Sequence, residues 1–168
     1  MGWWCYGFHP KKLFVFGDSY ADTGNLPKSF PDWQVPYGIT FPGKPDGHFS
    51  DGRVLTSFLV HPSLSQNMYS YVFCALLQFS DGNGADITIS VPDPPCTQTA
   101  VKFESPILKP CCFGTSIGYR CGSLNAKGEK MYTLCKNPKA TFFWDTVHPT
   151  QAGWRAVFIY LKSKFEKA

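Results

Sequence analysis

One short apolar run limits the fold class of this chain more than any other feature of its sequence. Residues 12–16 read Lys-Leu-Phe-Val-Phe and end at Gly17. A short apolar run without polar alternation is typical of a buried strand in a parallel sheet, and such a sheet needs helices to cover its faces. At 168 residues the chain is long enough for one domain of ordinary size. The sequence therefore predicts the α/β class and a single domain over residues 1–168.

Three segments have the apolar spacing of amphipathic helices. The first follows a cap at Ser50 or Asp51 and ends before Pro62, and the second covers residues 69–77. The third covers residues 151–165 and has the most regular pattern of the three. The positions of this third helix predicted to face the core are Trp154, Val157, Phe158, Leu161 and Phe165.

The remaining chain has few signals of regular structure. Residues 87–91 alternate like a short strand, and residues 141–144 are expected to form the end of another. Residues 18–52 are rich in Gly, Pro, Asp and Asn, and residues 92–139 begin with a cluster of prolines. Both of these stretches are expected to be loops.

The second of these loops contains most of the cysteines. Cys111, Cys112, Cys121 and Cys135 lie within 25 residues, in a polar, Gly-rich stretch that has little core of its own. Disulfides are the favoured interpretation. Zinc is disfavoured because the gaps between these cysteines match no Cys-x-x-Cys knuckle, and buried free thiols stay open as an alternative. The total of seven cysteines leaves at least one thiol unpaired.

Charge and hydropathy argue against a nucleic-acid partner and against a transmembrane segment. The net charge of +4 is too weak to favour nucleic acid. The longest apolar run, residues 71–77, is far shorter than the ~20 residues that span a bilayer. The first residues do not read as a signal peptide, whereas disulfides need an oxidising compartment. An N-terminal leader missing from this sequence would reconcile the two expectations.

A serine follows the predicted strand directly, in the sequence Phe-Gly-Asp-Ser over residues 16–19. Ligands of open α/β sheets gather beyond the carboxyl ends of the strands, so the Ser19 hydroxyl is well placed for nucleophilic attack. Gly17 would permit a sharp turn that presents the oxygen and the backbone N–H of Ser19 outward. The structural alternative is an ordinary loop turn.

A second chemical motif lies 126 positions later, at Asp145 and His148. An Asp three residues before a His can fix the tautomer of the imidazole and stabilise its protonated form. The structural alternative is a helix-capping Asp beside a surface His. The two motifs together predict a Ser-His-Asp set.

Residues 14–25, Phe-Val-Phe-Gly-Asp-Ser-Tyr-Ala-Asp-Thr-Gly-Asn, resemble the first block of the plant GDSL-type serine esterases and lipases of the SGNH hydrolase superfamily. Other segments resemble later parts of that family in the family's order, with His48 where Arg is usual. These segments are residues 36–41 and 47–53, the cysteine-bearing residues 109–112, 121–122 and 135–138, and the last block, residues 143–150.

The resemblance implies a three-layer α/β/α sandwich of the flavodoxin-like SGNH type, which hydrolyses ester or lipid substrates without a metal or organic cofactor. It implies Ser19 as the nucleophile, His148 as the general base and then acid, and Asp145 as the residue that orients His148. The Ser19 N–H would be one oxyanion donor. Asp18 is better suited to capping the helix expected after the serine. Members of the family are typically secreted.

Two middle blocks of the family, which supply a glycine N–H and an asparagine side chain to the oxyanion hole, are not recognisable in this chain. Gly82-Asn83-Gly84 has suitable residue types, but a turn is the favoured interpretation. Loss of one oxyanion donor costs about 10²–10³ in turnover. The chain is therefore expected to be a truncated hydrolase with weakened activity and few parallel strands, whose unpaired sheet edges promote self-association.

Two other functions stay open from the sequence. One is a non-catalytic remnant that acts as an interaction or regulatory fragment. The other is a small disulfide-rich binding module built on residues 92–139.

Overall fold

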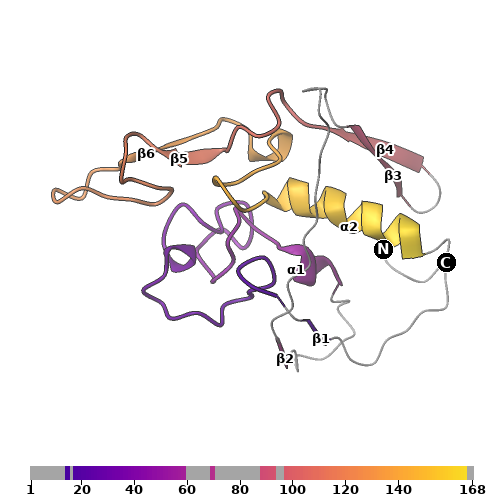
Figure 1. The fold of residues 1–168 in the computed structure, drawn as a ribbon, viewed down its shortest axis with the longest axis horizontal. Coiled ribbons are helices and arrows are strands. Elements are labelled where there is room, and N and C mark those ends of the chain that lie inside the picture. Colours follow the sequence, from indigo (N-terminus) through magenta and orange to yellow (C-terminus); the bar gives the residue numbers. More distant parts are fainter. Residues whose placement is uncertain (1–13, 16, 60–68, 71–87, 94–96, 166–168) are drawn as a thin grey trace.

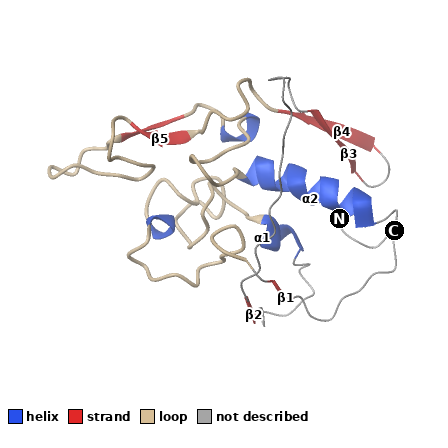
Figure 2. Ribbon diagram, viewed as in Figure 1, coloured by secondary structure: helices blue, strands red, loops and turns tan. Residues whose placement is uncertain are grey.

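The computed structural model describes residues 14–15, 17–59, 69–70, 88–93 and 97–165, which form a mixed α/β arrangement (Figures 1 and 2). In chain order the elements are β1 (Phe14–Val15), the 3₁₀ helix η1 (Pro31–Trp33), α1 (Leu55–Leu59), β2 (Tyr69–Ser70), β3 (Thr88–Asp93), β4 (Thr97–Lys102), β5 (Cys112–Gly114), β6 (Tyr132–Leu134), the 3₁₀ helix η2 (Pro138–Ala140) and α2 (Gln151–Phe165).

The strand predicted at residues 12–16 is present in its described part, as β1. It pairs in parallel with β2, with Phe14 opposite Tyr69 and Val15 opposite Ser70. The prediction of a helix beginning at Tyr69 is therefore wrong at its first two residues, and residues 71–87 lie outside the described part of the chain. The apolar spacing did not distinguish the two structures, because a short apolar segment fits a buried strand as well as a helix.

The prediction that residues 92–139 form only loop is also wrong. β3 continues through Pro92 and pairs with β4 as an antiparallel hairpin, and β5 pairs in the same way with β6. Pro92 is tolerated because a two-stranded sheet consists of edge strands only. Conversely, the strand expected at residues 141–144 is reduced to one isolated bridge between Phe143 and Pro149.

The prediction for α2 is confirmed at both ends. The helix begins after Thr150, whose Oγ1 accepts the Gly153 N–H at 2.9 Å in the manner of an N-cap. Trp154 and Val157 are buried as expected, but Ala156 and Ile159 are buried too. The buried face is wider than the predicted stripe because α2 contacts both α1 and β3 (Figure 1). No helix in the described part of the chain is long and apolar enough to cross a bilayer.

Ser50 and Asp51 do not cap α1, which has only five residues. Instead, the Ser50 hydroxyl donates to the Pro149 carbonyl at 3.1 Å, and Asp51 Oδ1 accepts the Gln151 N–H at 2.7 Å. The expected cap of the first helix is thus a cap of the last one. These two buried residues join the N-terminal loops to the start of α2.

Two disulfides connect the four clustered cysteines, Cys111 to Cys135 and Cys112 to Cys121. The disulfide prediction is confirmed, and both alternatives for these four residues, a zinc site and free thiols, are wrong. Cys5, Cys74 and Cys96 lie outside the described residues.

The apolar interior forms two clusters of buried residues. One surrounds α2, and the other contains three of the disulfide cysteines. The α2 cluster consists of Val54, Phe103, Phe142, Trp154, Ala156, Val157 and Ile159. The disulfide cluster consists of Tyr37, Cys111, Cys112, Cys121, Tyr132 and Trp144.

The disulfide cluster supports the segment that leads to Asp145. The Cys111 N–H donates to the Phe143 carbonyl at 2.9 Å, and the Cys112 N–H donates to the Trp144 carbonyl at 2.6 Å. Both bonds hold the backbone immediately before Asp145, so the cross-linked residues fix the position of the acidic motif.

Candidate active site

Ser19 lies in a tight turn over residues 18–21, which follows β1 closely in the chain. The Ala21 N–H donates to the Asp18 carbonyl at 3.0 Å, and Asp18 Oδ1 accepts the Tyr20 N–H at 3.0 Å. A β-carbon added at Gly17 would overlap that of Ala21, so the turn requires glycine there. Residues 17–54 contain no α-helix, and the prediction that Asp18 caps a helix after the serine is therefore wrong. The Asp18 side chain stabilises the turn itself.

The three side chains singled out by the sequence lie together. His148 Nε2 is 2.8 Å from Ser19 Oγ, across 129 positions of the chain. His148 Nδ1 is 2.9 Å from Asp145 Oδ1 and 2.8 Å from Asp145 Oδ2. The Nδ1–H therefore points to the carboxylate, which leaves Nε2 as the acceptor facing the serine hydroxyl.

Asp145 is fixed by the backbone that follows it. Its Oδ1 accepts the Val147 N–H at 2.8 Å and the His148 N–H at 2.7 Å, so one short turn positions both the carboxylate and the imidazole. The turn thus requires the spacing of three residues between Asp145 and His148 that is seen in the sequence.

Aromatic rings hold the imidazole in place. Phe49 stacks on His148 with ring centroids 4.7 Å apart and an interplanar angle of 24°. Tyr20 meets His148 edge-on at 5.5 Å, and its hydroxyl donates to the Val147 carbonyl at 3.0 Å. Phe49 and Tyr20 lie within segments that resemble the family, but no pattern in the sequence indicated that they contact His148.

Tyr37 is a further member of the site that sequence reasoning missed. Its hydroxyl donates to Asp145 Oδ2 at 2.9 Å, and both residues are buried. Its ring packs edge-on against Phe49 and Trp144. The carboxylate thus receives hydrogen bonds from two sides, one from the imidazole and one from the phenol.

These contacts decide the charge state of Asp145. Burial alone would raise the pKa of the Asp145 carboxyl, but the hydrogen bond and positive charge of His148, together with two backbone N–H groups, lower it below its ordinary value. Burial and the adjacent carboxylate raise the pKa of Tyr37, which keeps its proton and acts only as a donor. Asp145 is therefore an anion, which can stabilise the imidazolium that forms when His148 takes a proton.

Asp32 is a buried carboxylate near this site. It has no solvent-exposed surface, and neither carboxylate oxygen has a hydrogen-bond partner in the described part of the chain. Burial is the main cause that raises the pKa of Asp32, and the charge of Asp22 adds to the increase, whereas the charges of His148 and His48 oppose it. The ionised carboxylate therefore opposes folding.

We expect Asp32→Asn to stabilise the protein by about 1–2 kcal/mol at neutral pH. The gain should vanish below the ordinary carboxyl pKa of 3.8, where the carboxyl is protonated in both the folded and unfolded states. Thermal unfolding at acidic and neutral pH measures the difference. Asp22→Asn is the matched control, because Asp22 Oδ1 already accepts the N–H groups of Gly24 and Asn25. A gain that is the same at both pH values would contradict this account of Asp32.

The Ser19 N–H donates to no acceptor in the described part of the chain, so it can serve an oxyanion. Gly82-Asn83-Gly84 lies outside the described residues. No group of three or more His, Cys, Asp or Glu side chains among the residues that the structure describes is placed to hold a metal ion.

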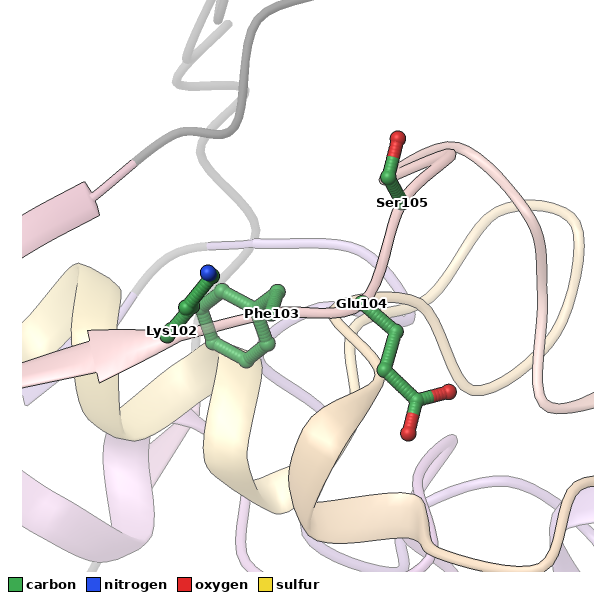
Figure 3. Close-up of a pocket in the computed structure, with 4 residues that line it drawn as sticks. All are labelled: Lys102, Phe103, Glu104 and Ser105. Carbon is green, nitrogen blue, oxygen red and sulfur yellow. The ribbon is translucent and has the colours of Figure 1, made fainter.

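Two surface cavities lie apart from Ser19 and His148. One of about 350 Å³ is lined by Lys102, Phe103, Glu104 and Ser105. Figure 3 shows Glu104 and Ser105 pointing in opposite directions, so these side chains do not converge on a ligand. The other, of about 280 Å³, is lined by Thr40, Asp51, Lys139, Gln151, Ala152 and Arg155. Neither cavity includes a member of the Ser-His-Asp set.

Comparisons with known proteins identify relatives of the chain. A GDSL esterase/lipase of Arabidopsis thaliana is 29% identical over 315 aligned positions, which cover 94% of this chain and 87% of the relative. A second Arabidopsis GDSL esterase/lipase is 67% identical over 55 residues, 32% of this chain and 15% of that protein. Acetylajmalan esterase 2 of Rauvolfia serpentina is 44% identical over 69 residues, 33% of this chain and 19% of that protein.

The long alignment crosses large gaps. It has 315 positions and the chain has 168 residues, so nearly half of its positions have no residue of this chain. The absence of two middle blocks noted in the sequence is consistent with these gaps. No protein-family model matches the chain, and no solved structure matches it.

Proposed function

We propose that this chain, a homologue of the plant GDSL esterase/lipases, hydrolyses carboxylic esters through an acyl-enzyme on Ser19. The observation that carries the proposal is the unbroken series of contacts from Ser19 Oγ through His148 to Asp145. The chemistry of these three groups is that of a hydrolytic triad.

In the first step, Ser19 Oγ attacks the ester carbonyl carbon while His148 Nε2 takes the hydroxyl proton. His148 then gives this proton to the leaving alcohol oxygen as its bond to carbon breaks, which leaves the acyl group on Ser19. In the second step, water attacks the acyl carbon and transfers a proton to His148. The acid leaves when Ser19 Oγ recovers that proton. Asp145 holds the Nδ1–H and stabilises the imidazolium at both stages.

Activity is expected to be weak because the oxyanion hole is incomplete. The Ser19 N–H is one donor, and the glycine and asparagine donors of the family are not recognisable in the sequence. Each absent donor costs about 10²–10³ in turnover.

The pairing of β1 with β2 fits an incomplete SGNH-type sandwich, whose remaining parallel strands would be few. Two disulfides favour an oxidising compartment as the site of action.

The covalent step can be tested directly with a fluorophosphonate probe, in which a serine oxygen displaces fluoride from phosphorus. We expect stoichiometric labelling of the purified chain, mapped to Ser19 by peptide mass spectrometry, and none in Ser19→Ala. Ser29→Ala is the matched control, because Ser29 is an exposed serine outside the site. Absence of labelling in a folded sample would favour the alternative, a non-catalytic remnant that acts as an interaction fragment.

Tyr37 is expected to be a positioning residue for this reaction. Tyr37→Phe removes the hydroxyl that donates to Asp145 Oδ2 but keeps the ring between Phe49 and Trp144. Since a hydrogen bond to a charged group contributes about 1.5–3 kcal/mol, kcat should fall about tenfold or more. KM should change little, because the hydroxyl binds Asp145, which orients His148 and is not itself the nucleophile.

Steady-state kinetics with a p-nitrophenyl ester measure the effects of Tyr37→Phe on kcat and on KM separately. Tyr132→Phe is the control, because Tyr132 is buried in the same disulfide cluster as Tyr37 but has no hydrogen bond to Asp145. If the two variants lower kcat equally, the effect is one of packing and Tyr37 has no specific role.

A further inference from the structure

We propose that the disulfide-braced residues 108–139, here called the cystine arm, bind the surface of membranes that contain anionic lipid. The proposal rests on the shape, charge and exposed apolar residues of the arm. It requires no catalytic group, and it would hold whether or not Ser19 is a nucleophile.

The cystine arm is an extended but internally cross-linked structure. Its strands β5 and β6 pair antiparallel, and the chain between them forms two loops that extend away from α1 and α2 (Figure 1). The disulfide from Cys112 to Cys121 closes the first loop, and a bridge between Leu124 and Lys130 closes the second. The backbone of these loops is therefore constrained and does not form a free coil.

The positive charge of the chain is concentrated in this arm. It has six cations and a single acidic residue, Glu129, which gives it a net charge of +5 against +4 for the whole chain. The six cations are all exposed, and the described residues supply no ion pair to them. They are Lys109, Arg120, Lys127, Lys130, Lys136 and Lys139. The rest of the chain is close to neutral, so the arm is the part that an anionic surface attracts.

Aliphatic side chains accompany these cations at the turns of the arm. Ile117 is 103% exposed, Leu108 75% and Leu124 54%. Ile117 lies within the turn closed by the Tyr119 N–H on the Ser116 carbonyl, and Gly118 holds that turn with a φ of +91°. Such exposure of large aliphatic side chains, next to lysine and arginine, is typical of segments that insert into the interfacial region of a bilayer.

The exposed aliphatic residues indicate which class of anionic partner the arm would bind. A nucleic acid or an acidic polysaccharide would use the cations but would gain nothing from Ile117, Leu108 and Leu124. A lipid surface uses both groups, because the cations meet the anionic headgroups while the aliphatic side chains enter the acyl boundary. The observations therefore favour a lipid surface.

Vesicle sedimentation of the whole oxidised protein tests the proposal. We expect binding to vesicles of phosphatidylcholine with phosphatidylglycerol, little binding to phosphatidylcholine alone, and loss of binding as salt shortens the range of the charges. Ile117→Asp and the double variant Lys127→Glu/Lys130→Glu should each lower the partition coefficient about tenfold or more. Ile39→Asp and Lys44→Glu, which change the same residue types outside the arm, should leave it unchanged.

Three results would overturn the proposal. Equal binding to neutral and anionic vesicles would remove the role of charge, and equal losses in the arm and control variants would remove the role of the arm. Binding to soluble polygalacturonate without binding to vesicles would assign the arm to a polysaccharide instead.

Thermal unfolding of each variant verifies its fold, and Ser19→Ala should bind vesicles like the wild type. A failure of the esterase proposal would thus be separate from a failure of this one.

Discussion

Ser19→Ala is expected to lower kcat/KM for a short p-nitrophenyl ester by at least about 10³-fold. The variant removes the hydroxyl oxygen that lies 2.8 Å from the imidazole acceptor of His148, so no acyl-enzyme can form on this residue. The loss should be smaller than in a complete hydrolase, since the missing oxyanion donors already lower the rate of the unmodified chain. Initial rates on the purified protein, corrected for spontaneous hydrolysis, measure the effect.

Three further variants make this measurement specific. Ser29→Ala changes an exposed serine outside the site and should keep the full rate. His148→Ala should lose nearly as much activity as Ser19→Ala, and the double variant should lose little more than either, because the two residues act in one step. Equal rates for the unmodified chain and Ser19→Ala would refute a catalytic role for Ser19, even though the relationship to the esterases would stand.

Removal of the disulfide between Cys111 and Cys135 is expected to have the largest effect on stability. The double variant Cys111→Ser/Cys135→Ser opens a loop whose ends are 24 positions apart, for which loop-closure entropy gives a loss of about 3.5 kcal/mol. The hydrogen bonds from Cys111 and Cys112 to the residues before Asp145 would weaken with it. We therefore expect a lower free energy of unfolding in urea and lower esterase activity at temperatures where the variant is still folded.

The second disulfide is the internal comparison for this prediction. Cys112→Ser/Cys121→Ser opens a loop of only 9 positions and should cost less, about 2.5–3 kcal/mol. Both variants replace the same residue types in the same cluster, so the difference between them reports loop length. An unchanged free energy of unfolding in the first variant would contradict the structural role assigned to this bridge.

Local patterns in the sequence predicted the elements that local interactions form. The helix over residues 151–165 was predicted from its apolar spacing, and the N-cap that the structure shows, Thr150, lies next to the helix itself. The short spacing between Asp145 and His148 likewise defines a turn whose hydrogen bonds all lie within four residues. The four clustered cysteines indicated disulfides, but their order along the chain did not specify which cysteine pairs with which.

Predictions failed where a residue's partner is distant in sequence. Aspartate commonly caps a helix that follows it directly, and Asp51 was therefore expected to cap the first helix. It binds the N–H of Gln151 instead, 100 positions away, because the first N–H groups of α2 have no partner within that helix. β2 and β4 were missed for a related reason, since a strand is stabilised by the segment beside it and not by its own residues alone.

The sequence by itself determined the chemistry of this protein: a serine after a strand, an Asp-His turn, a long amphipathic helix and a cross-linked loop. Only the tertiary structure decided that Ser19 and His148 lie in contact across 129 positions, that Tyr37 binds Asp145 and that the disulfides support the segment before it. The physical reason is the separation in sequence between the residues that interact. Turns and helices follow from interactions between near neighbours, whereas these contacts depend on loop closure and on the joint packing of both halves of the chain.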